Sequence, residues 1–360
     1  MVRDMGLKAY IIKRITYSCI LLLFVITLNF IIFFMMPGDP AQMWVNPTGR
    51  MSEAELSQQM AALRDLWGLG DPPHILFLKT TRSLLTFNFG KSIMSGTDII
   101  RTMQAKIPFT LLLLGSSSIF SIIIGVLLGV LSAHKRGETG DSFMVTSSLI
   151  FYSLPTFWMG MIFIEIFASQ LGWFPGAHSF PVDEWAMKGF PIPYTIAADP
   201  SRATLNILFS LNPQGLLNLV GGYAYHAFLP VLTLTLFSYG GYLLLTRATM
   251  LEALTEDYII TARAKGLTER SVLLRHALKN ASLPIITSVA LGFGFILSGA
   301  IITETVYTYE GLGHWIWDSI NARDYTVVLP IFYIIAICVI AANFIADLLY
   351  GILDPRIKYG

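Results

Sequence analysis

Six long apolar runs constrain this chain more than any other feature of its sequence. A helix needs roughly 20 apolar residues to cross a hydrocarbon core about 30 Å thick. Runs of about this length occupy residues 15–36, 107–133, 143–168, 226–245, 285–302 and 327–352. With a mean hydropathy of +0.63, the chain is also too apolar for an ordinary soluble domain. The sequence therefore predicts an all-α polytopic membrane protein with six transmembrane helices.

Lysine and arginine predict how these helices are oriented. If the N-terminus is cytoplasmic, the inside segments carry 14 of the 24 basic residues in about 70 positions, and the outside segments carry the other ten in about 145. This asymmetry follows the positive-inside rule. We therefore expect cytoplasmic segments at 1–14, 134–142, 249–284 and 353–360, and extracellular segments at 37–106, 172–225 and 303–326.

Two of the predicted outer segments are large. In the first, Ser52 and Glu55 have the spacing of a capping box, and apolar residues follow at helical spacing as far as Trp67. This pattern predicts a short amphipathic helix over residues 53–67, which either lies on the outer membrane face or docks an external partner. The second, 172–225, is rich in proline, glycine and aromatic residues, and we expect a lid of loops and short helices.

Several function classes are not supported by the residues. A net charge of +1 without a long run of like charge argues against nucleic acid. Cys19 and Cys338 lie inside apolar runs, where neither a disulfide nor a metal site is expected. The FGKS sequence ending at Ser92 resembles the tail of a phosphate-binding loop, but Leu85 occupies the position of its first glycine. We therefore expect no catalytic residues, no metal site and no cofactor bound by this chain.

Ionisable residues inside membrane spans usually mark ion-coupled transporters. The apolar runs contain only Glu165, Asp347 and the terminal His226, each near a helix end where packing or contact with water can explain it. A secondary transporter would therefore lack its coupling groups, and its energy would come from elsewhere. A secondary transporter and a non-transporting membrane scaffold both remain open alternatives.

Glycines inside the runs predict where helix backbones approach closely. Gly125 and Gly129 form a G-x-x-x-G pattern, which favours close packing between helices in lipid. Gly292, Gly294 and Gly299 interrupt the fifth run. That helix could pack closely or line a passage, and the sequence favours neither.

The segment 255–284 is unusually rich in charge and lies between two apolar runs. Thr255 is placed to cap a short helix that ends at Gly266, with acidic residues in the first turn and basic residues in the last. A second helix is expected to begin near Thr268 and to reach Pro284, which would start the fifth span. A cytoplasmic protein could grip such a short helix, although an ordinary solvated loop would have the same sequence features.

At these residues the chain resembles a known family. TARAKG at 261–266 and RHALKNASLP at 275–284 are similar to the cytoplasmic loop of ABC importer permeases of the dipeptide and oligopeptide branch, B-type subunit. Further matching motifs are PGDP at 37–40, FGKS at 89–92, IPFTLLLL at 107–114, ETGDSF at 138–143, SLPTFWMG at 153–160 and DPR at 354–356. The general importer motif begins Glu-Ala-Ala, whereas residues 260–262 are Ile-Thr-Ala here.

The resemblance implies a type I ABC importer permease fold with a cytoplasmic coupling helix. The implied function is to form half of a path for dipeptides or oligopeptides across the cell membrane, although oligosaccharides and nickel complexes stay open as substrates. The implied partners are a homologous second permease, two ATP-binding subunits that carry ATP and Mg, and an extracellular substrate-binding protein. Both termini would be cytoplasmic.

The resemblance also implies roles for particular residues. The expected ATPase-coupling residues are Ala262, Arg263, Ala264, Lys265, Gly266 and Leu267. The residues expected to line the translocation path are Ser153, Pro155, Tyr239, Gly294 and Ser298.

Overall fold

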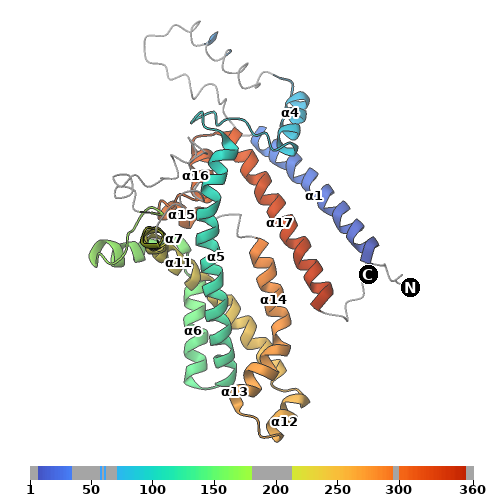
Figure 1. The fold of residues 1–360 in the computed structure, drawn as a ribbon, viewed down its shortest axis with the longest axis vertical. Coiled ribbons are helices and arrows are strands. Elements are labelled where there is room, and N and C mark those ends of the chain that lie inside the picture. Colours follow the sequence, from blue (N-terminus) through green and yellow to red (C-terminus); the bar gives the residue numbers. More distant parts are fainter. Residues whose placement is uncertain are drawn as a thin grey trace.

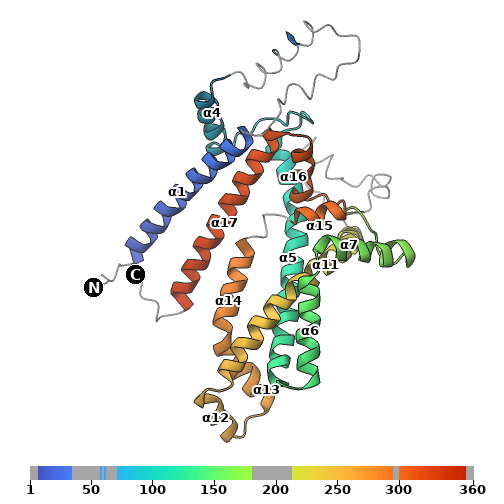
Figure 2. The ribbon, with the colours of Figure 1, turned by 180° about the vertical axis from the view of Figure 1, so that it is seen from behind.

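The computed structural model describes residues 7–34, 57–58, 61, 71–180, 213–294 and 300–353. Helices make up most of these ranges, which contain an isolated bridge between Lys91 and Asp98 but no named strand. Figures 1 and 2 show an elongated arrangement, with helix α5 along its middle and helix α12 at its lower end. The predicted all-α class is confirmed.

The helices extend beyond the apolar runs that predicted them. The first half of the chain forms α1 (Leu7–Phe34), α4 (Pro73–Leu85), α5 (Ile99–His134), α6 (Thr139–Ser153), α7 (Thr156–Phe163) and η1 (Ile164–Gln170). The second half forms α11 (Pro213–Ala253), α12 (Asp257–Ala264), α13 (Glu269–Ser271), η3 (Val272–Ala277), α14 (Leu278–Gly294), α15 (Ile301–Val306), α16 (Leu312–Asn321) and α17 (Tyr325–Leu353). The segments η1 and η3 are π-helices.

Among the described helices, α5 and α11 share the most extensive contact, and two glycines of α5 allow their backbones to approach closely. A Cβ atom added to Gly125 would lie 2.5 Å from Cβ of Tyr242, and one added to Gly129 would lie 2.6 Å from Cβ of Thr246. Any larger residue would push the two backbones apart. The predicted role of this G-x-x-x-G pattern in helix packing is confirmed.

The third apolar run is not one straight span. Helix α6 ends at Ser153, and the helical stretch Thr156–Gln170 leaves it at an angle of 99°. Leu154 has ψ of 135°, the extended conformation that a residue before proline prefers, and Pro155 has no N–H to continue the α6 hydrogen bonds. The expectation of a single helix over 143–168 is therefore corrected to a bent pair, a broken span or a re-entrant loop.

The described residues test the predicted number of spans and the predicted outer segments only in part. Four described helices are long and apolar enough to cross a membrane, or up to five spans if the bent pair counts as one, so six stays a prediction. Residues 213–225, expected in the outer lid, form the start of α11 instead. The amphipathic helix over 53–67 falls almost entirely outside the described residues, as do 181–212 of the expected lid.

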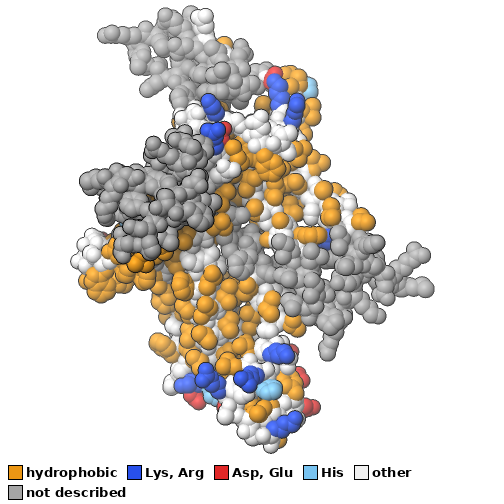
Figure 3. Space-filling view, viewed as in Figure 1, with side chains coloured by type: hydrophobic (Ala, Val, Ile, Leu, Met, Phe, Trp, Pro, Cys, Tyr) orange, Lys and Arg blue, Asp and Glu red, His pale blue; other side chains and the backbone are white. Residues whose placement is uncertain are grey.

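The surface has the banding expected of a membrane protein. Figure 3 shows hydrophobic side chains over the middle of the molecule, with Lys and Arg gathered near α12 at one end and near α4 at the other. The start of α1 and the end of α17 point toward the α12 end in both ribbon views. This arrangement agrees with an apolar zone between two polar ends.

Candidate coupling site and outer polar junction

The short helix α12 begins at Asp257, one residue later than a cap at Thr255 would place its start. Its N-cap is Glu256, whose backbone is extended with ψ of 147° and whose side chain makes no capping hydrogen bond. Thr255 belongs to the turn that closes α11, because its Oγ1 donates to the Glu252 carbonyl at 2.7 Å. The expectation that Thr255 caps this helix was therefore wrong.

Gly266 ends the turn after α12 as the sequence predicted. Its φ is +76°, in the left-handed region that favours glycine, and its N–H donates to the Arg263 carbonyl at 2.9 Å. A Cβ atom at this position would meet nothing within 4 Å. A substitution at Gly266 therefore strains the backbone without clashing with the rest of the chain.

One face of α12 is buried against its own chain. Ile259 and Ala262 are 0% and 4% exposed and belong to a cluster with Val130 of α5, Met250 of α11 and Val272 of η3. The three-residue spacing of Ile259 and Ala262 places both side chains on one helix face. Ala262 therefore holds α12 in place, and the expectation that it lies in the docking contact is corrected.

The opposite face of α12 and the following turn are exposed. Arg263, Ala264, Lys265, Gly266 and Leu267 are all exposed, and Ile260 and Leu267 leave 61% and 40% of their surfaces uncovered. The structure thus brings five of the six expected coupling residues onto one accessible surface. Exposed apolar side chains among charges are typical of a surface that a partner covers.

An ion pair joins α12 to the next helix. Arg263 Nη2 lies 2.8 Å from Glu269 Oε1, and His134 Nδ1 at the end of α5 lies 4.0 Å from the same oxygen. The hydrogen bond from Arg263 lowers the pKa of the Glu269 carboxyl, although the partial exposure of both side chains makes the pair weak. The expected second helix begins with α13, whose N-cap is Thr268, and α13, η3 and α14 follow one another without a break. Pro284 lies inside α14, and the start of the fifth membrane span at this residue stays a prediction.

A buried ion pair fastens α6 to α11 near this site. Arg247 donates from Nε and Nη2 to the two carboxylate oxygens of Asp141 at 2.8 and 2.7 Å. The same carboxylate accepts from Ser132 Oγ at 2.5 Å and from the Gly137 N–H at 3.1 Å. Asp141 belongs to the ETGDSF motif, but its pairing with Arg247 could not be predicted from local sequence because the two residues are 106 positions apart.

The expected path residues are not all brought together. Ser153 and Pro155 are exposed at the bend between α6 and α7. Tyr239 is 5% exposed and packs against Phe151 of α6, and its place in the path stays a prediction. Its burial follows from the close approach at Gly240, where an added Cβ would lie 2.9 Å from the Ser148 carbonyl oxygen. Gly294 ends α14, and Ser298 lies outside the described residues.

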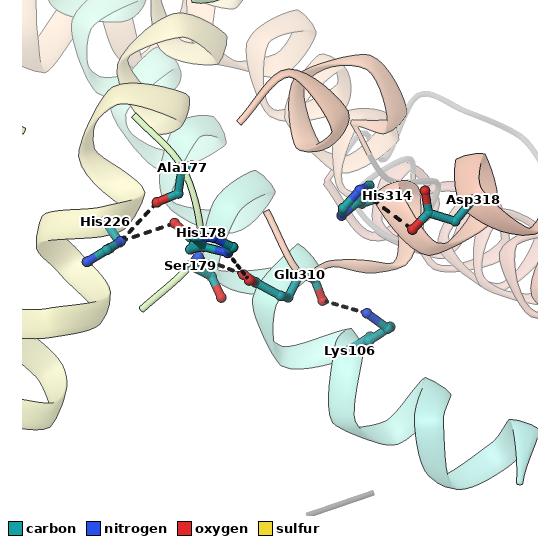
Figure 4. Close-up of polar contacts among 8 residues, drawn as sticks. All are labelled: Lys106, Ala177, His178, Ser179, His226, Glu310, His314 and Asp318. Atoms are coloured by element: carbon teal, nitrogen blue, oxygen red, sulfur yellow. Dashed lines mark hydrogen bonds and ion pairs between the residues drawn. The ribbon is translucent and has the colours of Figure 1, made fainter. Parts of the chain in front are cut away.

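A second polar cluster, which we call the outer junction, joins residues 177–179 to Glu310 (Figure 4). His178 Nδ1 lies 2.7 Å from Glu310 Oε1, and the Ser179 N–H donates to Glu310 Oε2 at 2.6 Å. Lys106 of α5 reaches the Glu310 carbonyl at 3.5 Å. His226 Nδ1 of α11 lies 3.2 Å from the Ala177 carbonyl, which supports a packing role for this histidine.

Two other carboxylates are buried in the same part of the chain. Glu304 is 0% exposed, accepts from Thr110 Oγ1 and from the His314 N–H, and has its pKa raised by burial. Asp324 is 2% exposed and accepts from Ser92 Oγ and the Met94 N–H. Sequence reasoning missed both because residues 303–326 were expected to be a solvated loop. The surrounding aromatic residues, as in VYTYEGLG at 306–313, were the available signal.

The comparison with known families decides the identity of the fold. The sequence model described as "Binding-protein-dependent transport system inner membrane component" matches residues 125–359, which is more than half of the chain and includes α12 and the Asp141–Arg247 pair. The chain belongs to this family. It is a transport-system permease with the type I ABC permease fold, and it is a multi-pass membrane component.

Named relatives of this permease agree over nearly the whole chain. The oligopeptide transport system permease protein AppB of Bacillus subtilis is 34% identical over 354 residues, which cover 98% of this chain and 100% of the relative. The di/tripeptide transport system permease protein DppB of Pseudomonas aeruginosa is 34% identical over 92% of this chain and 93% of its own length. The glutathione transport system permease protein GsiC of Salmonella paratyphi A is 31% identical, covering 97% and 99%.

Proposed function

We propose that this permease forms half of an ATP-driven import path for dipeptides or oligopeptides. Three relatives carry the names of oligopeptide, di/tripeptide and glutathione transport permeases. The observation that carries the ATP-driven part is α12, a helix of eight residues with one face buried in its own chain and the other face exposed. This arrangement fits a helix that a cytoplasmic ATPase grips.

The exposed side of α12 is the proposed docking surface for an ATP-binding subunit. Ile260 and Leu267 provide apolar contact, and Arg263 and Lys265 surround it with charge. ATP and Mg would bind to the partner subunits, two of which serve the transporter. ATP then favours the permease conformation that its closed ATPase pair fits, which is a two-state linkage.

Force applied to α12 would reach several helices at once. The cluster around Ile259 and Ala262 ties α12 to α5 and α11, and the Arg263–Glu269 pair ties it to α13. The Asp141–Arg247 pair then fastens α11 to α6. A packed core transmits displacement because it tolerates little deformation. We infer that α5, α6 and α11 move with the coupling helix.

A second, homologous permease would complete the path. Helix α7 buries Met159 and Gly160 against its own chain but exposes Phe157, Trp158 and Met161 at 45%, 47% and 57%. A contiguous apolar surface of this kind suits lipid or another membrane subunit. Among the described residues, we propose that Ser153 and Pro155, at the bend between α6 and α7, line the path. Both chain termini would lie in the cytoplasm.

Transport by reconstituted vesicles tests this function. The chain would be purified with a candidate second permease, candidate ATPases and a candidate binding protein, and sealed into vesicles with ATP inside the compartment that the ATPases face. We expect a labelled dipeptide to accumulate only with both ATP and binding protein present. Accumulation driven by a proton gradient without ATP would instead support a secondary transporter. Competition by oligosaccharides or nickel complexes would reassign the substrate.

A further inference from the structure

The three buried carboxylates between residues 304 and 324 hold different parts of the outer layer together. Glu304 accepts from Thr110 of α5, and Asp324 accepts from Ser92 in the turn before α5. Glu310 accepts from the Ser179 N–H, and its side chain also contacts His178. These hydrogen bonds join parts of the chain that are far apart in sequence. Side-chain carboxylates accept them, whereas inside a helix the acceptors are backbone carbonyls.

Glu310 differs from the other two in where its partner lies. Thr110 and Ser92 are 0% and 5% exposed, so both partners are internal. The His178 side chain is 47% exposed, whereas that of Glu310 is only 5% exposed. The contact between His178 and Glu310 therefore connects a buried carboxylate to a residue that an external protein can reach.

The backbone of His178 shows how firmly this segment is held. Its φ is +67°, a conformation that costs energy for a residue other than glycine and persists only where contacts impose it. The His178 N–H donates to the Tyr307 carbonyl at 3.0 Å, and His226 Nδ1 lies 3.3 Å from the His178 carbonyl. Residues 177–179 are thus fixed from α11 and from the turn after α15 (Figure 4).

Phe180 anchors the same segment from its other side. Its side chain is 0% exposed, stacks on Phe109 at a centroid distance of 6.1 Å and meets Tyr223 of α11 at 6.2 Å. The aromatic contacts hold residues 177–180 against α5 and α11, and the two contacts with Glu310 restrict the orientation of the segment. Leu171 and Trp173, a few residues earlier, leave 45% and 58% of their surfaces exposed.

We propose that Glu310 is a positioning residue that holds residues 171–180 in the orientation in which they contact the loaded substrate-binding protein. This inference rests on the proposed function, because it requires a binding protein on this side of the membrane. Trp173 and His178 supply the exposed contact surface, and Glu310 acts on the binding protein only through them. Weakening the Glu310 contacts changes how well this surface fits its partner while the ATPase-coupling end stays intact.

The test measures ATPase stimulation by increasing concentrations of binding protein loaded with a dipeptide. Glu310→Gln retains the size of the side chain but removes the charge that both contacts use. We expect the half-maximal concentration of binding protein to rise by about fivefold to tenfold, with the maximal and the unstimulated ATPase rates unchanged. Asp318→Asn is the matched control, since the Asp318 side chain is 61% exposed on the nearby helix α16 and should leave the half-maximal concentration unchanged.

A double-mutant cycle makes the result specific to the pair. His178→Ala should raise the half-maximal concentration by a similar factor, and the double variant should show no more than the larger single effect. His178→Gln restores a neutral donor and should recover part of the loss. Because His178 is half exposed, these variants keep the test usable if Glu310→Gln fails to assemble.

The outcomes separate this inference from the proposed function. If the unmodified complex shows no stimulation by binding protein, the proposed function itself fails. If the unmodified complex is stimulated and the variants match it, only the role of Glu310 is overturned. Equal loss of stimulated and unstimulated ATPase in a folded Glu310→Gln complex would also overturn it, because that result indicates general damage instead of altered docking.

Discussion

The two ends of this permease hold their outlying segments to the rest of the chain with different chemistry. At the coupling end, α12 is held by small apolar residues such as Ala262, and its charges face outward. At the outer end, buried carboxylates such as Glu310 and Asp324 join segments that no helix connects. Small side chains permit a helix to pack closely, whereas irregular segments leave backbone N–H groups that need acceptors.

The difference predicts how mutations act at each end. In α12, residues that hold the fold and residues that meet a partner are separate, even when they are close neighbours. At the outer junction one carboxylate serves both purposes, because Glu310 is internal and yet positions an exposed residue. The coupling end should therefore yield variants that lose transport with full stability, and variants that lose stability alone.

The largest expected effect is loss of the buried pair that supports the coupling end. Arg247→Ala leaves the Asp141 carboxylate, whose side chain is 6% exposed, without its cation. Leaving such a charge unpaired costs about 3–5 kcal/mol. We expect a large fall in thermal stability and in assembly, measured on the detergent-purified complex. Arg263→Ala breaks the exposed pair with Glu269 and should cost at most about 1 kcal/mol. Similar losses of stability from both variants would contradict the view that residues holding the fold and residues meeting a partner are separate at this end.

A second, smaller effect distinguishes the two faces of α12. Ala262→Asp places a carboxylate where the alanine is 4% exposed, which costs at least about 2 kcal/mol when no partner is available. Ala264→Asp makes the same change on the exposed face and should leave thermal stability unchanged while reducing ATP-driven uptake. If Ala264→Asp transports normally, the exposed face of α12 is not the docking surface.

Strain at Gly266 is expected to cost less stability than the change at Ala262. Gly266→Val and Gly137→Val both introduce a side chain at positive φ, +76° and +81°, where neither glycine has a neighbour within 4 Å. The strain is about 1–2 kcal/mol in each case. Only Gly266 lies in the proposed docking surface, so we expect Gly266→Val to lose ATP-driven uptake and Gly137→Val to retain most of it. Equal uptake by the two variants would show that strain alone decides the result.

The sequence predicted features that depend on local patterns and missed those that depend on distant contacts. Apolar runs located the long helices, and glycine spacing predicted that the helix at Gly125 and Gly129 packs closely against another helix, without indicating which one. Gly266 was recognised because a helix end has its own local signature. These properties depend on residues only a few positions apart.

Features set by tertiary contacts were not predictable in this way. The bend at Pro155 was hidden because the apolar run continues through it, although the proline was a usable signal. Ala262 is buried in a cluster that includes Val130, which lies 132 residues earlier in the sequence. Glu304 was expected in an extracellular loop; the aromatic residues beside it were a local sign of burial, but they did not indicate that Thr110 would be its partner.

The bend between α6 and α7 has a consequence for the biogenesis of the complex. Helix α7 buries Met159 and Gly160 on one side, where Gly160 faces Val306 and Tyr307, but Phe157 and Trp158 remain 45% and 47% exposed. A subunit made alone thus presents an aromatic surface that membrane quality-control proteases and chaperones can recognise as unassembled. Matched production of the second permease would then determine how much of this chain survives in the cell, independently of how stably it folds.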